Sequence, residues 1–327
     1  MPATTATTAR PVVIALEEHY LDPQVAAHFK GPRNDQEAVR SRLLDVAEGR
    51  LRDMDAAGID IQVLSHAAPA TQRLDADNAA SVARAANDRL HEAVRAHPTR
   101  FAAFAALPTA DPAAAADELE RTVTRLGFKG AMLHGLANGV FLDDRRFWPI
   151  FRRAEALDVP IYIHPAIPHP AVIEAYYRDY LTDFPSLVGA GWGFTVETAT
   201  QGVRLVLSGL FEECPRLKII LGHMGESLPF SLWRIDQVLS RRGNRPLAFR
   251  ETFCRHFYIT TSGNFSTPAL LCSMMELGVD RILFSVDYPY MDSAPGTQWL
   301  AGLPVSPEDR LKIMSGNARR LLRLETR

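Results

Sequence analysis

The chain has 327 residues, of which 36 are basic and 38 acidic, so its formal net charge is −2. This balance gives no basic surface of the kind that nucleic-acid-binding proteins carry, and no apolar run approaches the about 20 residues that a membrane-spanning helix needs. Three scattered cysteines, an odd number, indicate a reducing compartment without a disulfide framework. We therefore expect a cytoplasmic protein that binds neither nucleic acid nor membrane.

The N-terminal segment is small and polar, and it lacks the apolar stretch of a secretory signal. We expect residues 1–11 to be a disordered lead-in. No Gly/Ser-rich boundary and no internal repeat divides the rest of the chain, so residues 12–327 are predicted to form one domain.

Eight short apolar runs, each bounded by polar or turn residues, predict eight strands. Most of them are continuous rather than alternating, which is typical of strands buried on both faces of a parallel sheet. The runs comprise residues 12–16, 59–64, 101–107, 130–133, 159–163, 217–221, 257–261 and 282–286.

Segments with helical periodicity separate these runs. Residues 75–97 carry apolar side chains at four-residue spacing, which places them on one face of a helix. Asp111 and Pro112 begin the next helix as its N-cap and first residue, and Gly127 ends it. A last helix begins in the same way at Ser306.

Strands that alternate with helices in this number predict a single (β/α)₈ TIM barrel. A plain barrel needs about 250 residues, and part of the surplus is the aromatic-rich stretch of residues 169–194, which follows the fifth strand. A long insertion at a strand end more often forms a lid or wall over a site than a linker. We therefore expect a lid-like segment there.

Ionisable residues end several of the predicted strands. In a (β/α)₈ barrel the active site lies at the C-terminal ends of the strands, and buried charges there are costly unless something uses them. Glu17 and His19 follow the first strand and point to one face, while His164 follows the fifth strand and Asp287 the eighth. Two carboxylates and two imidazoles suit one divalent ion, Zn²⁺ or Mn²⁺ and less readily Mg²⁺.

Five further residues have both a functional and a structural interpretation. His223 ends the sixth strand, and Glu226 could orient its imidazole if a helix begins there, or could simply be a carboxylate at a helix N-terminus. Arg234 could clamp a substrate carboxylate, although a helix-surface arginine is commoner. Trp192 and Tyr290 could form stacking walls of a pocket, although aromatic residues beside a barrel usually belong to its core.

The other histidines carry less information. Three lie at strand ends or in the insertion and could reach the rim of the pocket: His66, His134 and His169. Four are expected to be structural: His28, His91, His97 and His256.

Six motifs in order along the chain are similar to those of one known family. They are ALEEH, IYIHP, LKIILGHMGE, ITTSGNFST, RILFSVDYPY and GNARRLL. Together they resemble the amidohydrolase superfamily, in the branch that holds the γ-resorcylate, 2,3-dihydroxybenzoate and salicylate decarboxylases. The Glu-x-His opening is fairly specific, because related metal-dependent hydrolases usually open with His-x-His.

The resemblance implies a (β/α)₈ barrel with one catalytic divalent metal ion, assembled as a homodimer or homotetramer. The implied reaction is the non-oxidative, reversible decarboxylation of an ortho-hydroxylated aromatic acid. The implied metal ligands are Glu17, His19, His164 and Asp287. Asp287 would also protonate the ring carbon that bears the carboxylate, which requires a raised pKa of its carboxyl group.

The resemblance also implies residues that contact the substrate. His223, supported by Glu226, would lie beside it, and Tyr290 matches an aromatic contact. Arg234 matches a position that can reach a substrate carboxylate, also across a subunit interface. His134 stands where these decarboxylases tend to carry asparagine, so we expect it to alter substrate recognition.

Two alternatives stay open at this point. A hydrolase or hydratase on the same scaffold would act on a lactone, an ester or an unsaturated acid, and the fold alone cannot exclude it. A non-catalytic binding protein would have a broken ligand set, whereas here every ligand position is filled. The Glu-x-His opening and the order of the motifs favour the decarboxylase.

Overall fold

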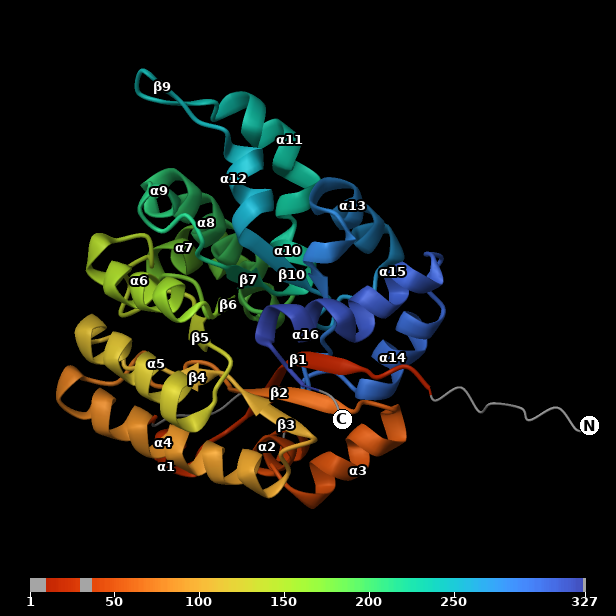
Figure 1. Ribbon diagram of the computed structural model, residues 1–327. Coiled ribbons are helices and arrows are strands. Elements are labelled where there is room, and N and C mark those ends of the chain that lie inside the picture. The colour runs from red at the N-terminus through yellow and green to blue at the C-terminus, as the bar shows by residue number, and fades with distance from the viewer. Residues whose placement is uncertain (1–9, 30–36, 326–327) are drawn as a thin grey trace, which may run out of the picture.

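The structure, a computed structural model, describes residues 10–29 and 37–325. Most of the predicted lead-in, residues 1–9, lies outside the described residues. Parallel strands form the centre of the molecule and helices surround them (Figure 1). The barrel strands are β1 (Ile14–Tyr20), β2 (Ile61–His66), β3 (Phe101–Ala103), β4 (Ala105–Ala106), β5 (Ala131–His134), β6 (Ile161–His164), β7 (Ile219–Leu221), β10 (Phe257–Thr260) and β11 (Ile282–Leu283).

Hydrogen bonds at two seams join these strands into a barrel. One parallel sheet has the order β1-β2-β3 and the other the order β11-β10-β7-β6-β5-β4. β3 and β4 are halves of one predicted strand, and the N–H of Phe104 between them donates to the carbonyl of Leu64 at 2.9 Å. At the second seam Leu16 bridges Ser285 in parallel, and its N–H donates to the carbonyl of Phe284 at 3.1 Å. The predicted (β/α)₈ barrel is confirmed.

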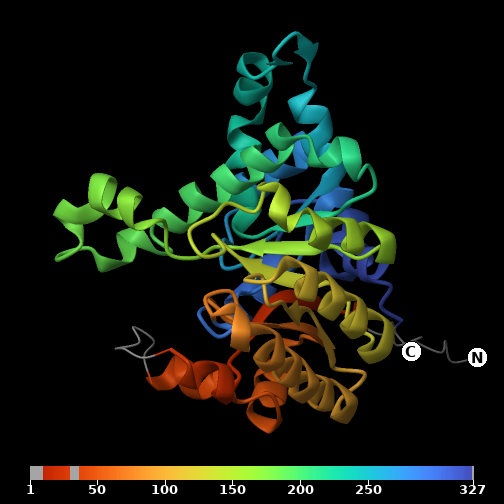
Figure 2. The ribbon, with the colours of Figure 1, turned by 90° about the vertical axis from the view of Figure 1, so that its left-hand side faces the viewer.

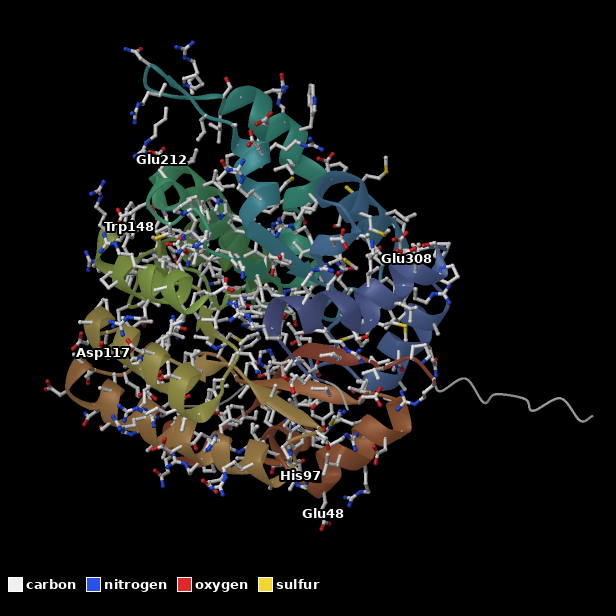
Figure 3. The ribbon with its side chains drawn as sticks, in the orientation of Figure 1. Glu48, His97, Asp117, Trp148, Glu212 and Glu308 are labelled. Carbon is white, nitrogen blue, oxygen red and sulfur yellow. The ribbon has the colours of Figure 1, made fainter. Side chains whose placement is uncertain are left out.

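Helices form the outer layer, with charged side chains such as Glu48 and Asp117 on its outside (Figure 3). No helix in the described part of the chain is long and apolar enough to cross a membrane. The helices of four or more residues outside the insertion are α1 (Pro23–Ala27), α2 (Glu37–Leu44), α3 (Glu48–Ala57), α4 (Ala76–Ala96), α5 (Pro112–Leu126), α6 (Trp148–Leu157), α8 (Gly193–Ser208), α9 (Leu210–Glu213), α10 (His223–Glu226), α11 (Leu228–Val238), α12 (Phe249–His256), α13 (Thr267–Leu277), α14 (Ser293–Ala301), α15 (Pro307–Leu311), η6 (Lys312–Gly316) and α16 (Asn317–Leu322).

The predicted helix boundaries have clear local causes. The Asp111 carboxylate accepts hydrogen bonds from the N–H groups of Ala113 and Ala114, at 3.0 and 3.1 Å, and so caps α5. Gly127 ends that helix in the left-handed conformation, at φ 74°. The Ser306 hydroxyl accepts from the N–H of Asp309 at 3.0 Å and caps α15. Sequence and structure agree at these helix ends.

Buried apolar side chains form two main layers. The larger layer lies between the strands and the helices and includes Phe253 on α12 and Phe257 on β10, whose rings stack 4.4 Å apart. The smaller one includes alternate strand residues such as Ile14 and Leu16, together with residues of α16. Alternation along each strand explains the division, because successive side chains point to opposite faces.

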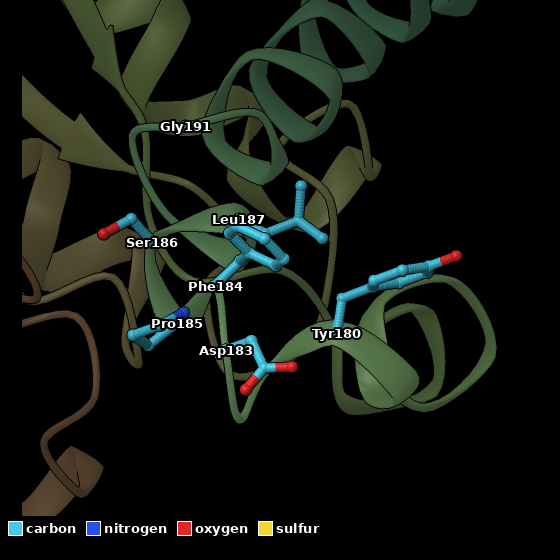
Figure 4. Close-up of a pocket in the computed structure, with 7 residues that line it drawn as sticks. All are labelled: Tyr180, Asp183, Phe184, Pro185, Ser186, Leu187 and Gly191. Atoms are coloured by element: carbon cyan, nitrogen blue, oxygen red, sulfur yellow. The ribbon is translucent and has the colours of Figure 1, made fainter.

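The insertion after β6 projects from the barrel as an arm (Figure 2). It contains short helical segments: α7 (Pro170–Val172), η2 (Ile173–Tyr177), η3 (Arg178–Tyr180) and η4 (Pro185–Val188). An open cavity of about 600 Å³ lies in the arm, lined by Tyr180, Phe184 and Leu187 among others (Figure 4). The insertion is where the sequence placed it, and its action as a lid stays a prediction.

Removing the Phe253 ring tests the outer layer of the core. Phe253→Ala should lower the free energy of unfolding by about 3–5 kcal/mol, because the ring is fully buried and its loss leaves a cavity. Urea denaturation followed by circular dichroism measures this change. Glu92→Ala is the control, since its side chain is 68% exposed, and it should change stability by less than about 0.5 kcal/mol. Similar losses in both variants would contradict the packing described.

Candidate functional site

A bulge in β1 directs Glu17 and His19 into the barrel. Ile14 and Leu16 belong to the inner apolar layer, whereas Ala15 packs with the outer one. Strict alternation would therefore point Glu17 outward. The pairing with β2 shifts between Ala15 and Glu18, and Glu17 has φ 59°. This extra residue inverts the faces, so that Glu17 and His19 follow Leu16 on the inside.

The four predicted metal ligands lie together at the C-terminal ends of the strands. One ligand atom from each of Glu17, His19, His164 and Asp287 lies within 4.8 Å of all the others. His19 Nε2 is 3.3 Å from Asp287 Oδ1, and His164 Nε2 is 3.3 Å from Glu17 Oε1. The side chains of Glu17 and His19 are fully buried. β1, β6 and the segment after β11 thus supply one compact ligand set.

Several ligand atoms of this set lack the hydrogen-bond partners that buried polar atoms need, and a bound cation would satisfy them. Glu17 Oε1, His19 Nε2 and Asp287 Oδ1 are buried and have no hydrogen-bond partner among the described residues. Buried polar atoms without partners are costly. Two carboxylate oxygens and two imidazole nitrogens match the donors of Zn²⁺ and Mn²⁺. The residues present therefore fit one divalent metal ion.

Neighbouring groups fix the orientation of the ligand side chains. Ser65 Oγ lies 3.3 Å from His19 Nδ1, and the carbonyl of Pro165 lies 2.7 Å from His164 Nδ1. These contacts leave the Nε2 atoms facing the cluster. The second carboxylate oxygen of Glu17 accepts hydrogen bonds from the hydroxyls of Ser262 and Thr260.

Gly222 at the end of β7 makes room for the Glu17 carboxylate. A Cβ atom at this glycine would come within 2.9 Å of Glu17 Oε2 and 3.2 Å of the Tyr162 hydroxyl. A larger residue would therefore displace the ligand. This is a specific steric reason for the glycine that precedes His223.

His223 and Glu226 form a hydrogen-bonded pair beside the cluster, with Nδ1 and Oε1 2.7 Å apart. The sequence left open whether a helix begins at His223. Residues 223–227 all have positive φ, so α10 is a left-handed turn, and the regular helix α11 begins at Leu228. The left-handed turn still brings the two side chains together. His223 Nε2 lies 3.6 Å from Glu17 Oε1 and 3.8 Å from Asp287 Oδ2.

Burial and neighbouring charges shift the pKa values of these groups in opposite directions. Burial lowers the pKa of His19, which favours the neutral imidazole that a metal ion needs. Burial alone would lower the pKa of His223, but the carboxylates of Glu226 and Glu17 raise it well above its ordinary value.

The predicted raised pKa of Asp287 is wrong. Burial would raise the pKa of this carboxyl group, but contacts with His19 and His223 outweigh burial and lower it. These contacts favour a carboxylate on Asp287 and a proton on His223.

Two of the predicted substrate contacts lie at the cluster. The Tyr290 ring is 5.7 Å from the His19 ring. His134 is buried, and its Nδ1 lies 3.1 Å from His164 Nδ1. His134 Nε2 has no hydrogen-bond partner in the part of the chain that the structure describes.

Two other predicted contacts are not brought to the cluster within one chain. Trp192 is 52% exposed, where the arm meets α8. Arg234 is exposed on α11 and makes no hydrogen bond or ion pair to another described residue. Neither residue has a described contact with the four ligands.

His66 and His169 both accept hydrogen bonds from nearby backbone N–H groups. His66 accepts a hydrogen bond from the N–H of Asp22 at 3.1 Å through Nε2, and its Nδ1 lies 2.7 Å from the Ala67 carbonyl. His169 accepts from the N–H of Ala171 at 3.1 Å and caps α7.

Sequence reasoning missed the buried residues behind the ligands. Glu18, Gln62 and Arg50 have no exposed surface. Only Glu18 carries a signal in the sequence, because it stands between two predicted ligands. Burial raises the pKa of Glu18 to about 8, although the Val286 N–H and the Arg50 charge act against it.

The sequence profile of the family described as "Amidohydrolase" matches residues 19–324. This chain belongs to the amidohydrolase family. The family member "gamma-resorcylate decarboxylase" of Polaromonas sp. is 43% identical over 325 residues, which cover 95% of this chain and 98% of that protein. The predicted resemblance to decarboxylases of hydroxylated benzoates is confirmed.

Solved structures of similar proteins extend this result to the fold. The crystal structure of a 2,6-dihydroxybenzoate decarboxylase complexed with 2,6-dihydroxybenzoate has a TM-score of 0.87 and 41% identity, covering 96% of this chain and 99% of that one. A dihydroxybenzoic acid decarboxylase from Polaromonas sp. JS666, with bound manganese and the inhibitor 2-nitroresorcinol, has a TM-score of 0.88 and 42% identity, covering 96% and 98%.

The ligand set predicts that metal-free protein takes up one Mn²⁺ per chain. At a free Mn²⁺ concentration 100 times the Kd, the free energy of unfolding should rise by about 2.7 kcal/mol. Elemental analysis and chemical denaturation measure the stoichiometry and the stabilisation. Asp287→Ala should lose most of both effects, because it removes a ligand.

His223→Ala is the matched control for that variant, because His223 lies beside the cluster but outside the four-ligand set. It should keep one Mn²⁺ per chain. Loss of the metal from His223→Ala would show that His223 is itself a ligand.

Proposed function

We propose that this chain is a metal-dependent decarboxylase of an ortho-hydroxylated aromatic carboxylic acid. The observation that carries the proposal is the compact set of two carboxylates and two imidazoles beside the His223–Glu226 pair. The similarity to decarboxylases over almost the whole chain supports the same reaction class. No redox cofactor, biotin or thiamine is needed for this chemistry.

Glu17, His19, His164 and Asp287 would hold the ion. When bound, a divalent ion supplies positive charge that binds the carboxylate and the adjacent phenolate oxygen of the acid. The relative from Polaromonas sp. JS666 has bound manganese, so we propose Mn²⁺ for this chain, with Zn²⁺ as the alternative. The remaining tasks fall to the protein: to position the ring and to deliver one proton.

His223 and Asp287 handle the proton. The raised pKa of His223 keeps its imidazole protonated, and Asp287 Oδ2 lies 3.8 Å from its Nε2. Asp287 receives this proton and passes it to the ring carbon that bears the carboxylate. The new C–H bond breaks aromaticity. The carbon–carbon bond to the carboxylate then breaks, CO₂ leaves, and the electron pair of that bond restores the aromatic ring.

Glu226 is a positioning residue in this scheme. Its Oε1 holds His223 Nδ1 at 2.7 Å, which directs Nε2 toward Asp287. Its negative charge also stabilises the imidazolium form.

We propose 2,6-dihydroxybenzoate and related acids as the substrate class. Similar proteins carry this activity in their names, and one was solved with 2,6-dihydroxybenzoate bound. The Tyr290 ring near His19 offers a stacking face for the acid. The partnerless Nε2 of His134 offers a polar contact for a ring substituent.

Activity assays on Mn²⁺-loaded protein test the reaction class. We expect CO₂ release from 2,6-dihydroxybenzoate and the reverse carboxylation of resorcinol in bicarbonate. His223→Ala should lower kcat by about 10²–10⁴-fold, since it removes a positioned proton carrier.

The same preparation should be offered lactones, esters and unsaturated acids. Hydrolysis or hydration of one of these, with no turnover of any hydroxybenzoate, would favour the alternative enzyme class. Wild-type activity in Asp287→Ala would contradict the proposed proton path.

We also propose that the chain acts as a homodimer or homotetramer. α11 and α13 contact each other and expose large apolar side chains, with Phe230 85%, Trp233 63% and Met275 84% exposed. Exposed apolar patches of this kind mark protein interfaces. Arg234 lies on the same surface with its guanidinium unpaired among the described residues. It would meet the substrate carboxylate in a neighbouring copy.

Light scattering coupled to size exclusion tests the assembly. Trp233→Glu should convert the oligomer to a smaller species, because burying an unpaired charge at the interface is unfavourable. Leu311→Glu is the matched control, since Leu311 is a partly exposed apolar residue on α15, outside the patch. Equal masses for wild type and Trp233→Glu would contradict this interface.

Residues 12–327 would form the single catalytic domain. Its three cysteines are free of disulfides, which supports a cytoplasmic location.

A further inference from the structure

Arg50 on α3 is a fully buried arginine behind the predicted metal ligands. A buried guanidinium is rarely found without several partners, because its desolvation is costly. Here Nε donates to the carbonyl of Asp45 at 2.9 Å, and Nη1 donates to Gln62 Oε1 at 3.2 Å. Nη2 donates to the carbonyl of His19. One guanidinium thus holds the backbone of a predicted ligand from outside the barrel.

The same guanidinium lies over the ring of Tyr288, 4.6 Å from its centre. Arg42 also lies over this ring, at 4.5 Å, and the Tyr288 hydroxyl donates to Asp53 Oδ2 at 2.8 Å. Tyr288 directly follows Asp287. The residue after the fourth ligand is therefore fixed by contacts with both the ring and the hydroxyl.

Glu18 holds the residue on the other side of Asp287. Its Oε1 accepts from the N–H of Val286 at 2.9 Å, and its Oε2 accepts from Gln62 Nε2 at 3.3 Å. Gln62 in turn accepts from Arg50. These contacts form a continuous path from the residue before Asp287 to the residue after it. We call Glu18, Gln62, Arg50 and Tyr288 the ligand brace.

Backbone conformation shows why such a path is needed. Glu17 and Asp287 have φ values of 59° and 72°, in the left-handed region that non-glycine residues rarely adopt. Each such residue costs about 1–3 kcal/mol and persists only where its surroundings enforce it. The ligand brace includes the residue that follows each of these two, Glu18 after Glu17 and Tyr288 after Asp287. Its position matches the two points where the ligand backbone is strained.

We infer that the ligand brace positions Glu17, His19 and Asp287 for the metal ion, so that its members set metal affinity without contacting the ion. This inference rests on the proposed metal site. Outer partners of metal ligands commonly change metal affinity by about 10–100-fold when they are removed. A purely structural role would instead lower stability and leave the affinity of the folded protein unchanged.

Gln62→Met tests the inference, because it keeps the side-chain volume and removes both amide contacts. Titration calorimetry of the metal-free full chain with Mn²⁺ should show the Kd rising by about tenfold or more. Arg50→Lys keeps the buried charge but loses the planar guanidinium with its several N–H donors, so the Kd for Mn²⁺ should rise in this variant as well. This second variant keeps the test available if Gln62→Met does not fold.

Asn87→Leu is the matched control. Asn87 is equally buried, and its side-chain amide forms hydrogen bonds with Ala106 and Glu118, away from the four ligands. It should lower the thermal midpoint without changing the Kd for Mn²⁺. An unchanged Kd in the brace variants, or an equal rise in Asn87→Leu, would overturn the inference. Failure of the wild type to bind Mn²⁺ would instead overturn the proposed metal site.

Discussion

Two carboxylates that share one buried position are the constraint on which the rest of this structure depends. Glu17 and Asp287 each place a ligand atom within 4.8 Å of the other and of an imidazole nitrogen of both His19 and His164. Without a cation, their mutual repulsion and desolvation would have to be met by protonation or by unfolding of the surroundings. Contacts with His19 and His223 lower the pKa of Asp287 and so favour its ionised form. Serine and threonine hydroxyls donate to Glu17, and a protonated His223 stands beside Asp287.

The carboxylates at the mouth of the barrel differ in the positive group that balances their charge. The ligand carboxylates are balanced by an ion that the protein must acquire, whereas Glu226 is balanced by an imidazole that the protein already carries. In the proposed mechanism the four-ligand cluster would bind the anionic acid and His223 would supply the proton. His223 Nε2 lies 3.8 Å from Asp287 Oδ2, so these two functions would lie side by side.

The sequence was sufficient for the barrel and for the meeting of Glu17, His19, His164 and Asp287, because strand order and strand ends together determine where those residues lie. It was insufficient where local conformation departs from the regular pattern. The sequence could not decide whether a helix begins at His223; the segment is a left-handed turn, and no residue in it except Gly225 favours positive φ. The expected proton on Asp287 is displaced by neighbours that lie far away in the chain. Arg50 could not be recognised at all, since its partners come from several different segments.

The Glu-Glu-His triplet could be transplanted into another protein only together with the bulge in β1. On a regular strand that began with the same inward Ile14 and Leu16, Glu18 would point to the barrel axis, and the two ligands would point to the helices. The triplet therefore carries its chemistry only together with the extra residue that shifts the register. Grafting it into another barrel would require copying the backbone bulge as well as the three residues. A design with a regular strand would point Glu17 and His19 away from the barrel axis.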